Sequence, residues 1–178
     1  MSIDLAGERG KKELLISLPF EDFQRVCSTN KEFNSYCNEY PHSEELFKER
    51  SYRWIHPDYF QFKEPIMTWK DFYLRVVNLT REIASGKRTS IIAHNAAYQG
   101  NIFELRILEK FDPNFNFSPH DSEIIFAAIY GDKPQILEWA KSHGVLPTEI
   151  DYQDAKERNR ENVVKWMEAN GIGKRLLI

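Results

Sequence analysis

Two stretches of the chain place the same kinds of residue at the same inner spacing. AIYGDKPQILEWAKSHG, residues 128–144, is followed 27 positions later by AKERNRENVVKWMEANG, residues 155–171. In both stretches a small Ala precedes a polar turn, and an aliphatic pair, Trp and Gly follow at matched positions. This self-similarity predicts helical hairpins that stack on one another, because one hairpin cannot bury its apolar face alone.

The pattern extends upstream to give three predicted helix-turn-helix units. Ala97, Gly100, Leu105 and Leu108 align with Ala128, Gly131, Ile136 and Trp139 at a period of 31, and the later set aligns with Ala155, Val163 and Trp166 at 27. We expect Gly100 and Gly131 to adopt the positive φ that ends a first helix, and Gly144 and Gly171 to end the second. The alternative is that two amphipathic helices of similar length share Trp and Gly by chance.

The first half of the chain shows helix signals without this repeat. Residues 1–12 lack periodicity and are predicted to be a flexible tail, with order beginning near Glu13. Pro19 suits the first turn of a helix, where its missing N–H would be unpaired anyway. In SEELFKERSYRWI an apolar ridge includes one charged residue, Arg50. The prediction is an all-α protein, with a helical domain over 13–88 and helical repeats over 89–178.

Two spacings in this half match the capping box, in which a Thr hydroxyl and an acidic side chain satisfy free amides at a helix start. These are Thr29-x-x-Glu32 and Thr68-x-x-Asp71. The second precedes the clearest amphipathic helix of the half, which we expect to end at Ser85-Gly86. HPDYFQFKEP, bracketed by two prolines, is predicted to be loop, and YFQFK inside it is the only segment that competes as a strand.

Charge and composition exclude some classes of partner. The formal net charge is −3, with 14 basic and 14 acidic residues up to Arg88 and 10 basic and 13 acidic after it. A nucleic-acid-binding protein usually shows a positive excess on one face, so we expect no nucleic-acid partner. No apolar run near the N-terminus resembles a signal peptide or a membrane span.

The two cysteines, Cys27 and Cys37, lie ten positions apart in predicted helices. With His42 and His56 they fit no common zinc spacing, so we expect two small buried thiols rather than a metal or redox site. Together with the missing signal peptide, this predicts an intracellular protein. The sequence does not distinguish cytoplasm, nucleus or virion.

No motif predicts enzyme activity or a cofactor. The chain has no Gly-rich phosphate loop, no G-x-S-x-G elbow and no H-E-x-x-H, and its five His residues are scattered. His94 lies in a predicted first helix, where a structural role is the expectation. A cysteine nucleophile would need a positioned base, which the sequence does not indicate. We therefore expect a non-enzymatic protein without metal or cofactor.

The second half resembles the ankyrin repeat. SIIAHNAAYQGNIFELRILEKF and SEIIFAAIYGDKPQILEWAKSHG are similar to its first helix ending in Ala-Ala, its x-x-Gly-Asn or x-x-Gly-Asp turn and its second helix ending in Gly. The resemblance covers about residues 89–173. The Thr-Pro-Leu-His start is absent, Arg158-Asn159 replaces the Gly-Asp turn, and the units are shorter than the family repeat.

The first half resembles the F-box-like head of many proteins from giant DNA viruses of amoebae. The resemblance rests on LLISLPFEDFQRVCSTNKEFNSYC, with its Leu-Pro pair, and on TWKDFY. It implies docking on a Skp-type adaptor of cullin ubiquitin ligases in the host, while the repeats recruit a target. The residues that would then face the adaptor are Leu15, Leu18, Pro19, Phe20 and Phe23.

Two hypotheses for function follow, both non-enzymatic. In the first, the chain is a viral adaptor that links the ubiquitin machinery of the host to a target. The alternative for the Leu14–Phe23 segment is that it packs on the helix predicted over 68–84. In the second, the chain is a structural or virion scaffold, and it self-associates as a homodimer through its apolar end, Arg175-Leu-Leu-Ile178. That end instead folds back on the last unit in the simpler alternative.

Overall fold

The computed structural model describes residues 7–115, 117 and 122–173. Within these ranges it contains eleven α-helices and one 3-10 helix, and no strand, so the predicted all-α class is confirmed. The chain divides into two units, Met1–Thr80 and Arg81–Ile178, and the division falls within helix α5 (Trp69–Ala84). None of the described helices combines the length and the apolar character that crossing a bilayer requires.

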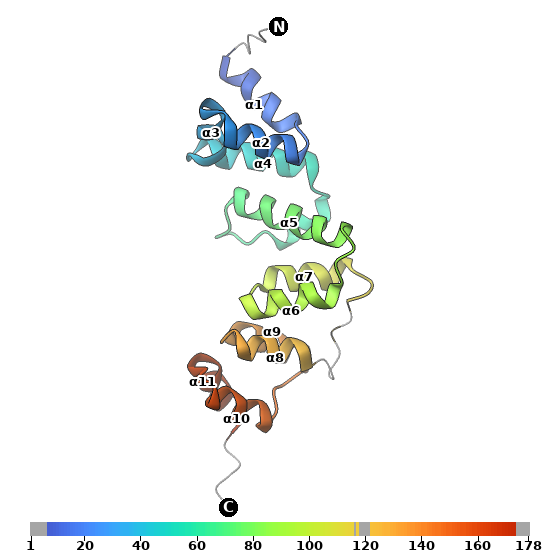
Figure 1. Cartoon of the computed structure of the whole chain (residues 1–178), viewed down its shortest axis with the longest axis vertical. Helices are drawn as coiled ribbons and strands as arrows, with labels where there is room; N and C mark the ends of the chain where they lie inside the picture. The colour runs from blue at the N-terminus through green and yellow to red at the C-terminus, as the bar shows by residue number, and fades with distance from the viewer. Residues whose placement is uncertain (1–6, 116, 118–121, 174–178) are drawn as a thin grey trace, which may run out of the picture. The chain divides into compact units, whose positions relative to one another are not determined.

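Unit 1 is built from short helices (Figure 1), and its core contains several aromatic side chains. Its elements are α1 (Gly7–Ser17), α2 (Phe20–Thr29), α3 (Lys31–Asn38), α4 (His42–Trp54), the 3-10 helix η1 (Pro57–Phe62) and the first part of α5. Helix α4 packs against both α1 and α3, and α3 also packs against α2. The largest buried side chains of the core include Leu15, Phe23, Leu46, Phe47, Phe72 and Tyr73.

Helix α1 begins at Gly7, so the expectation that order starts near Glu13 is wrong. Residues 1–6 of the predicted tail lie outside the described residues. Lys12 is paired with Glu49 of α4, with 2.6 Å between Nζ and Oε1. Further along the same helix, Leu15 is fully buried. Such contacts between elements distant in the sequence hold the first turns of α1 in place, and a search for periodicity within α1 alone cannot detect them.

The boundary between α2 and α3 lies one residue later than the predicted capping box. Asn30, not Thr29, is the N-cap of α3, because the Asn30 side chain accepts hydrogen bonds from the amides of Glu32 and Phe33. The Thr29 hydroxyl instead donates back to the carbonyl of Arg25 within α2. Asn is among the best N-cap residues, which explains why it takes the position from its neighbour.

The segment predicted as loop contains η1, so the prediction is wrong for Pro57–Phe62. The ring of Phe60 packs between those of Trp69 and Phe72, with centroid distances of 6.1 and 5.7 Å. The competing prediction of a strand at YFQFK also fails, because the first four of these residues belong to the 3-10 helix and Lys63 is its C-cap. At the second predicted capping box the Thr68 cap is confirmed, since the amide of Asp71 donates to the Thr68 hydroxyl at 3.0 Å. The Asp71 carboxylate accepts from that hydroxyl at 2.7 Å.

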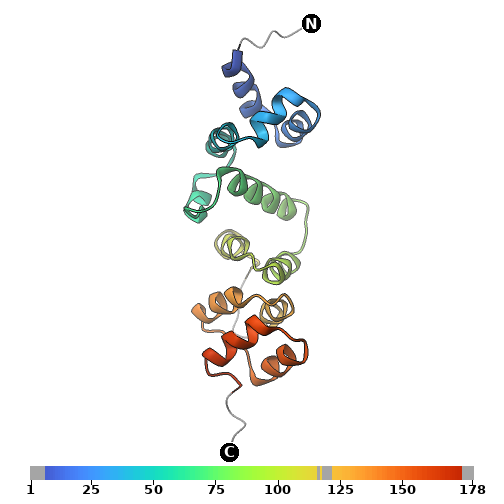
Figure 2. The same ribbon diagram turned by 90° about the vertical axis from the view of Figure 1, so that its left-hand side faces the viewer.

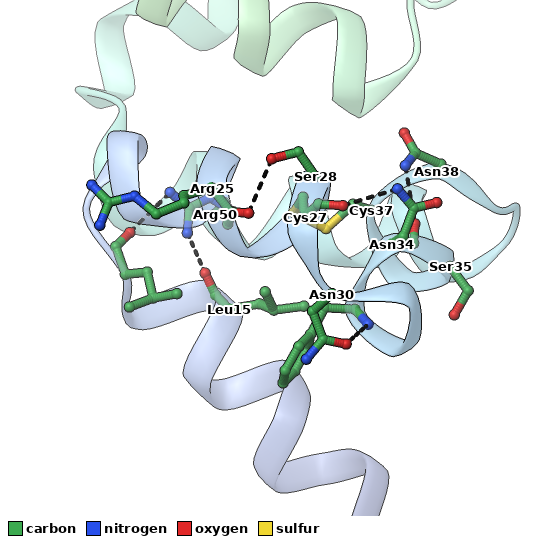
Figure 3. Close-up of a disulfide and its surroundings, with 12 residues drawn as sticks. Leu15, Arg25, Cys27, Ser28, Asn30, Asn34, Ser35, Cys37, Asn38 and Arg50 are labelled. Carbon is green, nitrogen blue, oxygen red and sulfur yellow. Dashed lines mark hydrogen bonds between the residues drawn. A yellow bond between two sulfur atoms is a disulfide. The ribbon is translucent and has the colours of Figure 1, made fainter.

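Cys27 and Cys37 form a disulfide, so the expectation of free thiols is wrong (Figure 3). The turn at Asn30 sends α3 back along α2 and brings the two Cα atoms to 5.9 Å, inside the range that a disulfide spans. Spacing along the sequence does not reveal this antiparallel arrangement. Because disulfides persist in oxidising compartments, the cysteines no longer support the expected intracellular location.

Unit 2 contains three consecutive pairs of helices (Figures 1 and 2). The pairs are α6 (Thr89–Gln99) with α7 (Ile102–Phe111), α8 (Ser122–Tyr130) with α9 (Pro134–Ser142), and α10 (Glu149–Glu157) with α11 (Glu161–Ala169). Between pairs, α8 packs against α6 and α10, and α9 packs against α7 and α11. Each pair therefore covers an apolar face of its neighbour.

The same backbone hydrogen bond closes the turn of every pair. The amides of Asn101, Lys133 and Arg160 each donate to the carbonyl of the Ala five positions earlier in the first helix. Lys133 comes 32 positions after Asn101, and Arg160 comes 27 after Lys133. The predicted period of 27 matches this geometry, whereas the predicted 31 is one residue too short.

The one-residue error arises from the turn conformation. The positive φ is at Gly100 in the first pair, but at Asp132 (54°) and Asn159 (56°) in the other two, so the expectation for Gly131 is wrong. Gly131 is instead a site of close approach, since a Cβ there would lie 2.0 Å from the backbone oxygen of Tyr98. Asp and Asn tolerate the left-handed conformation better than other non-glycine residues.

The remaining expectations concern glycines at helix ends and the apolar end of the chain. Gly144 and Gly171, with φ of 77° and 80°, follow α9 and α11 as predicted. Gly86 ends α5 in the same way, with φ of 79°. The apolar end of the chain, for which folding back or self-association is the expectation, lies outside the described residues.

Candidate protein-binding surfaces

The predicted adaptor-facing segment lies at the junction of α1 and α2, and its side chains differ in exposure. Leu15 and Phe23 belong to the core of unit 1, with 0% and 2% of their surface exposed. Leu18 and Phe20 are partly exposed, and Pro19 is exposed. The structure thus brings Leu18, Pro19 and Phe20 together at the surface and turns the other two inward.

Aromatic packing holds Phe23 inside the core and leaves Phe20 partly covered. The Phe23 ring meets that of Phe47 edge-on at 5.6 Å, and the Phe20 ring lies 6.2 Å from that of Tyr73 in α5. Part of the segment therefore packs on the helix that the sequence predicted over 68–84. Burying the ring of Phe23 contributes on the order of 2 kcal/mol to folding.

Arg50 fixes this junction from inside the core. Its side chain is fully buried, and its guanidinium lies 3.8 Å above the ring of Phe23. Nη1 donates to the carbonyl of Leu15 (Figure 3), and Nη2 donates to the carbonyl of Leu18 at 3.0 Å. Nη2 also donates to the Tyr73 hydroxyl at 2.8 Å.

Arg50 supplies hydrogen-bond donors to backbone carbonyls at the C-terminal end of α1. The last carbonyls of α1 have no partner within the helix and carry the negative end of its dipole, which attracts a cation. Burial lowers the pKa of Arg50, and the Tyr73 hydroxyl partly offsets this effect. Burial likewise raises the pKa of Tyr73. An arginine within an apolar ridge was the only sequence signal for this arrangement.

A groove crosses the first helices of the three pairs in unit 2. It encloses about 590 Å³ and is lined by Ser90, Ile91, His94, Glu123, Phe126 and Asp151. Ile91 and Phe126 remain 47% and 44% exposed in α6 and α8. Large apolar side chains at the surface of a groove are typical of binding sites, whereas isolated ones are common on any surface.

The groove is acidic around its apolar centre. Glu123 and Asp151 line it, and no lysine or arginine is among its described lining residues. Asp151 also caps α10, where its Oδ2 accepts hydrogen bonds from the amide and hydroxyl of Thr148. His94, expected to be structural, is partly exposed in this groove. The repeat pattern did not predict the groove, because it identifies buried positions and not exposed ones.

Ser142, His143 and Glu109 lie close together and are the residue types of a hydrolytic triad, but their hydrogen bonds differ from those of a triad. Nε2 of His143 lies 2.7 Å from Glu109 Oε1, and Ser142 Oγ lies 3.2 Å from His143 Nδ1. However, Nδ1 also faces the carbonyl of Trp139 at 2.8 Å, and Ser142 donates to that same carbonyl. Both ring nitrogens face acceptors, so the imidazole has no position that takes the serine proton.

The described residues contain no group of three His, Cys, Asp or Glu side chains arranged to hold a metal ion. Comparison of the chain with protein-family models, with curated proteins and with solved structures found no match.

Proposed function

We propose that this protein is a non-enzymatic protein–protein interaction module whose groove over α6, α8 and α10 binds a segment of a partner protein. The observation that carries the proposal is the exposure of Ile91 and Phe126 in a groove of about 590 Å³. Exposed apolar area of this kind favours burial against a partner, at about 25 cal/mol for each Å² covered.

The charges of the groove define the chemistry of the partner. Glu123 is exposed and Asp151 is partly exposed, so a bound segment would bring basic side chains beside them. An apolar anchor would fill the space between Ile91 and Phe126. We therefore expect a segment in which a Leu or Phe is flanked by Lys or Arg.

The ankyrin-like reading of unit 2 belongs to this proposal. It is supported by the stacked helix pairs and by the shared turn hydrogen bond of Asn101, Lys133 and Arg160. In such an array each pair contributes one first helix to a continuous surface. The proposed partner segment would then contact α6, α8 and α10 in turn.

The viral ubiquitin adaptor remains a second candidate, supported by the exposure of Pro19 and the partial exposure of Leu18 and Phe20. Leu15 and Phe23 would not face a Skp-type protein while unit 1 is folded, because both are buried. A Pro19→Glu variant tests this candidate without entering the core. A Skp-type protein that binds the wild type and not this variant would support it, and equal binding or no binding at micromolar concentration would contradict it.

The groove is tested with a rhodamine-labelled peptide, acetyl-Lys-Lys-Leu-Phe-Lys-Lys-amide, by fluorescence anisotropy. We expect saturable binding that weakens as salt rises, because charge pairs contribute to it. Glu123→Lys should weaken binding about tenfold, since it replaces an attraction by a repulsion. Phe126→Ala should also weaken it, through loss of apolar contact.

A matched control is available on the same unit. Glu157 is exposed at the end of α10 and does not line the groove, so Glu157→Lys changes the net charge equally without changing the site. Equal loss of binding in Glu123→Lys and Glu157→Lys would show non-specific electrostatic attraction and contradict the proposal. Light scattering of the same samples tests the homodimeric scaffold, which a monomer at all concentrations would contradict.

A further inference from the structure

Unit 1 contains a separate cleft beside its disulfide. The cleft encloses about 420 Å³ and is lined by residues of α2, α3, α4 and α5. Phe23, Phe47 and Leu74 supply apolar atoms to it, and the Cys27–Cys37 disulfide forms part of its wall. The cleft thus combines an apolar floor with a covalently fixed side.

The charge of this cleft is opposite to that of the groove in unit 2. Among the described lining residues the charged side chains are Arg25 and Lys70, and none is acidic. Arg25 is paired with Asp22 at 3.4 Å. Within the part of the chain that the structure describes, the partners of Lys70 are neutral: the amide oxygen of Asn38 at 2.8 Å and the ring of Phe47 at 5.7 Å. Its ammonium charge therefore faces the cleft without a carboxylate to balance it.

The rim of the cleft is held in place before anything binds. The side-chain amide of Asn34 donates to the carbonyl of Cys27 at 2.9 Å, and that of Asn38 donates to the carbonyl of Asn34 at 3.0 Å (Figure 3). The disulfide joins the same two helices. A site fixed in this way loses little conformational entropy when a ligand binds, which favours affinity.

We propose that this cleft binds an acidic segment of a partner protein, with a carboxylate paired to Lys70 and an apolar side chain packed on Leu74, which is partly exposed. Charge complementarity selects this occupant, because a basic segment would meet the ammonium of Lys70, whereas Arg25 is already paired with Asp22. The site is independent of the function proposed for unit 2, since the two surfaces carry opposite charge and share no residue. The protein would then have two docking sites of different specificity.

The test uses the oxidised full chain and the peptide acetyl-Glu-Glu-Leu-Phe-Glu-Glu-amide, labelled with rhodamine, beside its lysine counterpart. We expect the acidic peptide to bind and its affinity to fall as salt rises. Lys70→Glu should weaken this binding at least tenfold. Lys31→Glu is the matched control, because Lys31 is exposed on α3 outside the cleft, and it should change the affinity less than twofold.

Lys70→Gln serves as a second variant, since it removes the charge and keeps a donor for Asn38. Circular dichroism establishes that each variant is folded. Unchanged affinity in folded Lys70→Gln would overturn the proposal, as would equal affinity for both peptides. Glu123→Lys separates the two sites, because it should weaken only the lysine peptide. If Glu123→Lys instead strengthens binding of the glutamate peptide while Lys70→Glu has no effect, that peptide occupies the groove and the cleft is not its site.

Discussion

Arg50 gives the sharpest test of how unit 1 is held together. The variant Arg50→Met keeps most of the side-chain volume and removes the guanidinium. In the wild type that group donates to the carbonyls of Leu15 and Leu18 and to the Tyr73 hydroxyl. In the variant these acceptors stay in place and lose their donor, because they belong to the backbone of α1, to the α1–α2 connection and to α5.

The magnitude follows from the bonds that are lost. A hydrogen bond from a charged group contributes about 1.5–3 kcal/mol, and a buried acceptor left without a partner costs about 1–3 kcal/mol. Arg50 Nη1 also donates to the carbonyl of Ile16 at 3.4 Å. That carbonyl keeps a second donor, Trp54 Nε1 at 2.8 Å, so losing the bond from Arg50 costs little there. The Leu18 carbonyl is only partly buried, so water replaces part of its bond. We therefore expect Arg50→Met to lower the free energy of unfolding of unit 1 by about 4 kcal/mol.

The assay is urea denaturation followed by circular dichroism and tryptophan fluorescence. Arg53→Met is the control, because Arg53 is an exposed residue of the same helix, and it should change the stability by less than about 0.5 kcal/mol. Arg50→Lys should fall between the two, since an ammonium lacks the planar fork that reaches several acceptors. A loss below about 1 kcal/mol in Arg50→Met would refute the reasoning, because it would show that the α1 carbonyls do not depend on this donor.

Two further predictions concern the disulfide and one buried carboxylate. The Cys27–Cys37 bond closes a loop of sequence separation 10, for which loop-closure entropy gives about 2.7 kcal/mol, so a double Ser variant should lower the urea midpoint of unit 1 and make it insensitive to reductant. An unchanged midpoint would contradict this. Asp112 accepts a hydrogen bond from the Thr89 hydroxyl, which with the Asn114 amide lowers the pKa of the carboxyl. Because the pKa of Asp112 is lower in the folded state, the ionised carboxylate stabilises the fold. This stabilisation is present above the unfolded-state pKa of about 3.9 and is lost as pH falls through the folded-state pKa. Near pH 6, Thr89→Val should therefore reduce the free energy of unfolding by about 1 kcal/mol, seen as a lower melting temperature. The difference between variant and wild type should shrink below about pH 4. A difference that does not change with pH would contradict the assignment.

Several elements were predictable because their signals are local. The α5 helix shows its cap at Thr68 and its buried stripe within one short segment, and both are present in the structure. The turns that join the two helices within each pair were also located correctly, because glycine and polar residues cluster there. The error at Gly131 shows the limit of this approach, since the residue needing positive φ is its neighbour Asp132.

The candidate sites were less predictable. Five residues between Leu15 and Phe23 were singled out by the F-box-like resemblance of an apolar segment, but neither resemblance nor apolar character separates a buried side chain from an exposed one. The groove of unit 2 depends on Ile91 and Phe126 remaining exposed while their neighbours pack. The cleft of unit 1 depends on the position of Lys70 beside α3, which lies more than thirty residues earlier in the chain.

The sequence by itself determined the all-α class, the three helix pairs and most helix ends, because these follow from periodicity and from the conformational preferences of Gly, Pro and Thr. Tertiary structure alone decided the disulfide, the burial of Arg50 and the exposure that defines both candidate binding sites. The physical reason is that pairing, burial and charge balance depend on distances between segments far apart in the chain, and a linear pattern contains no such distances.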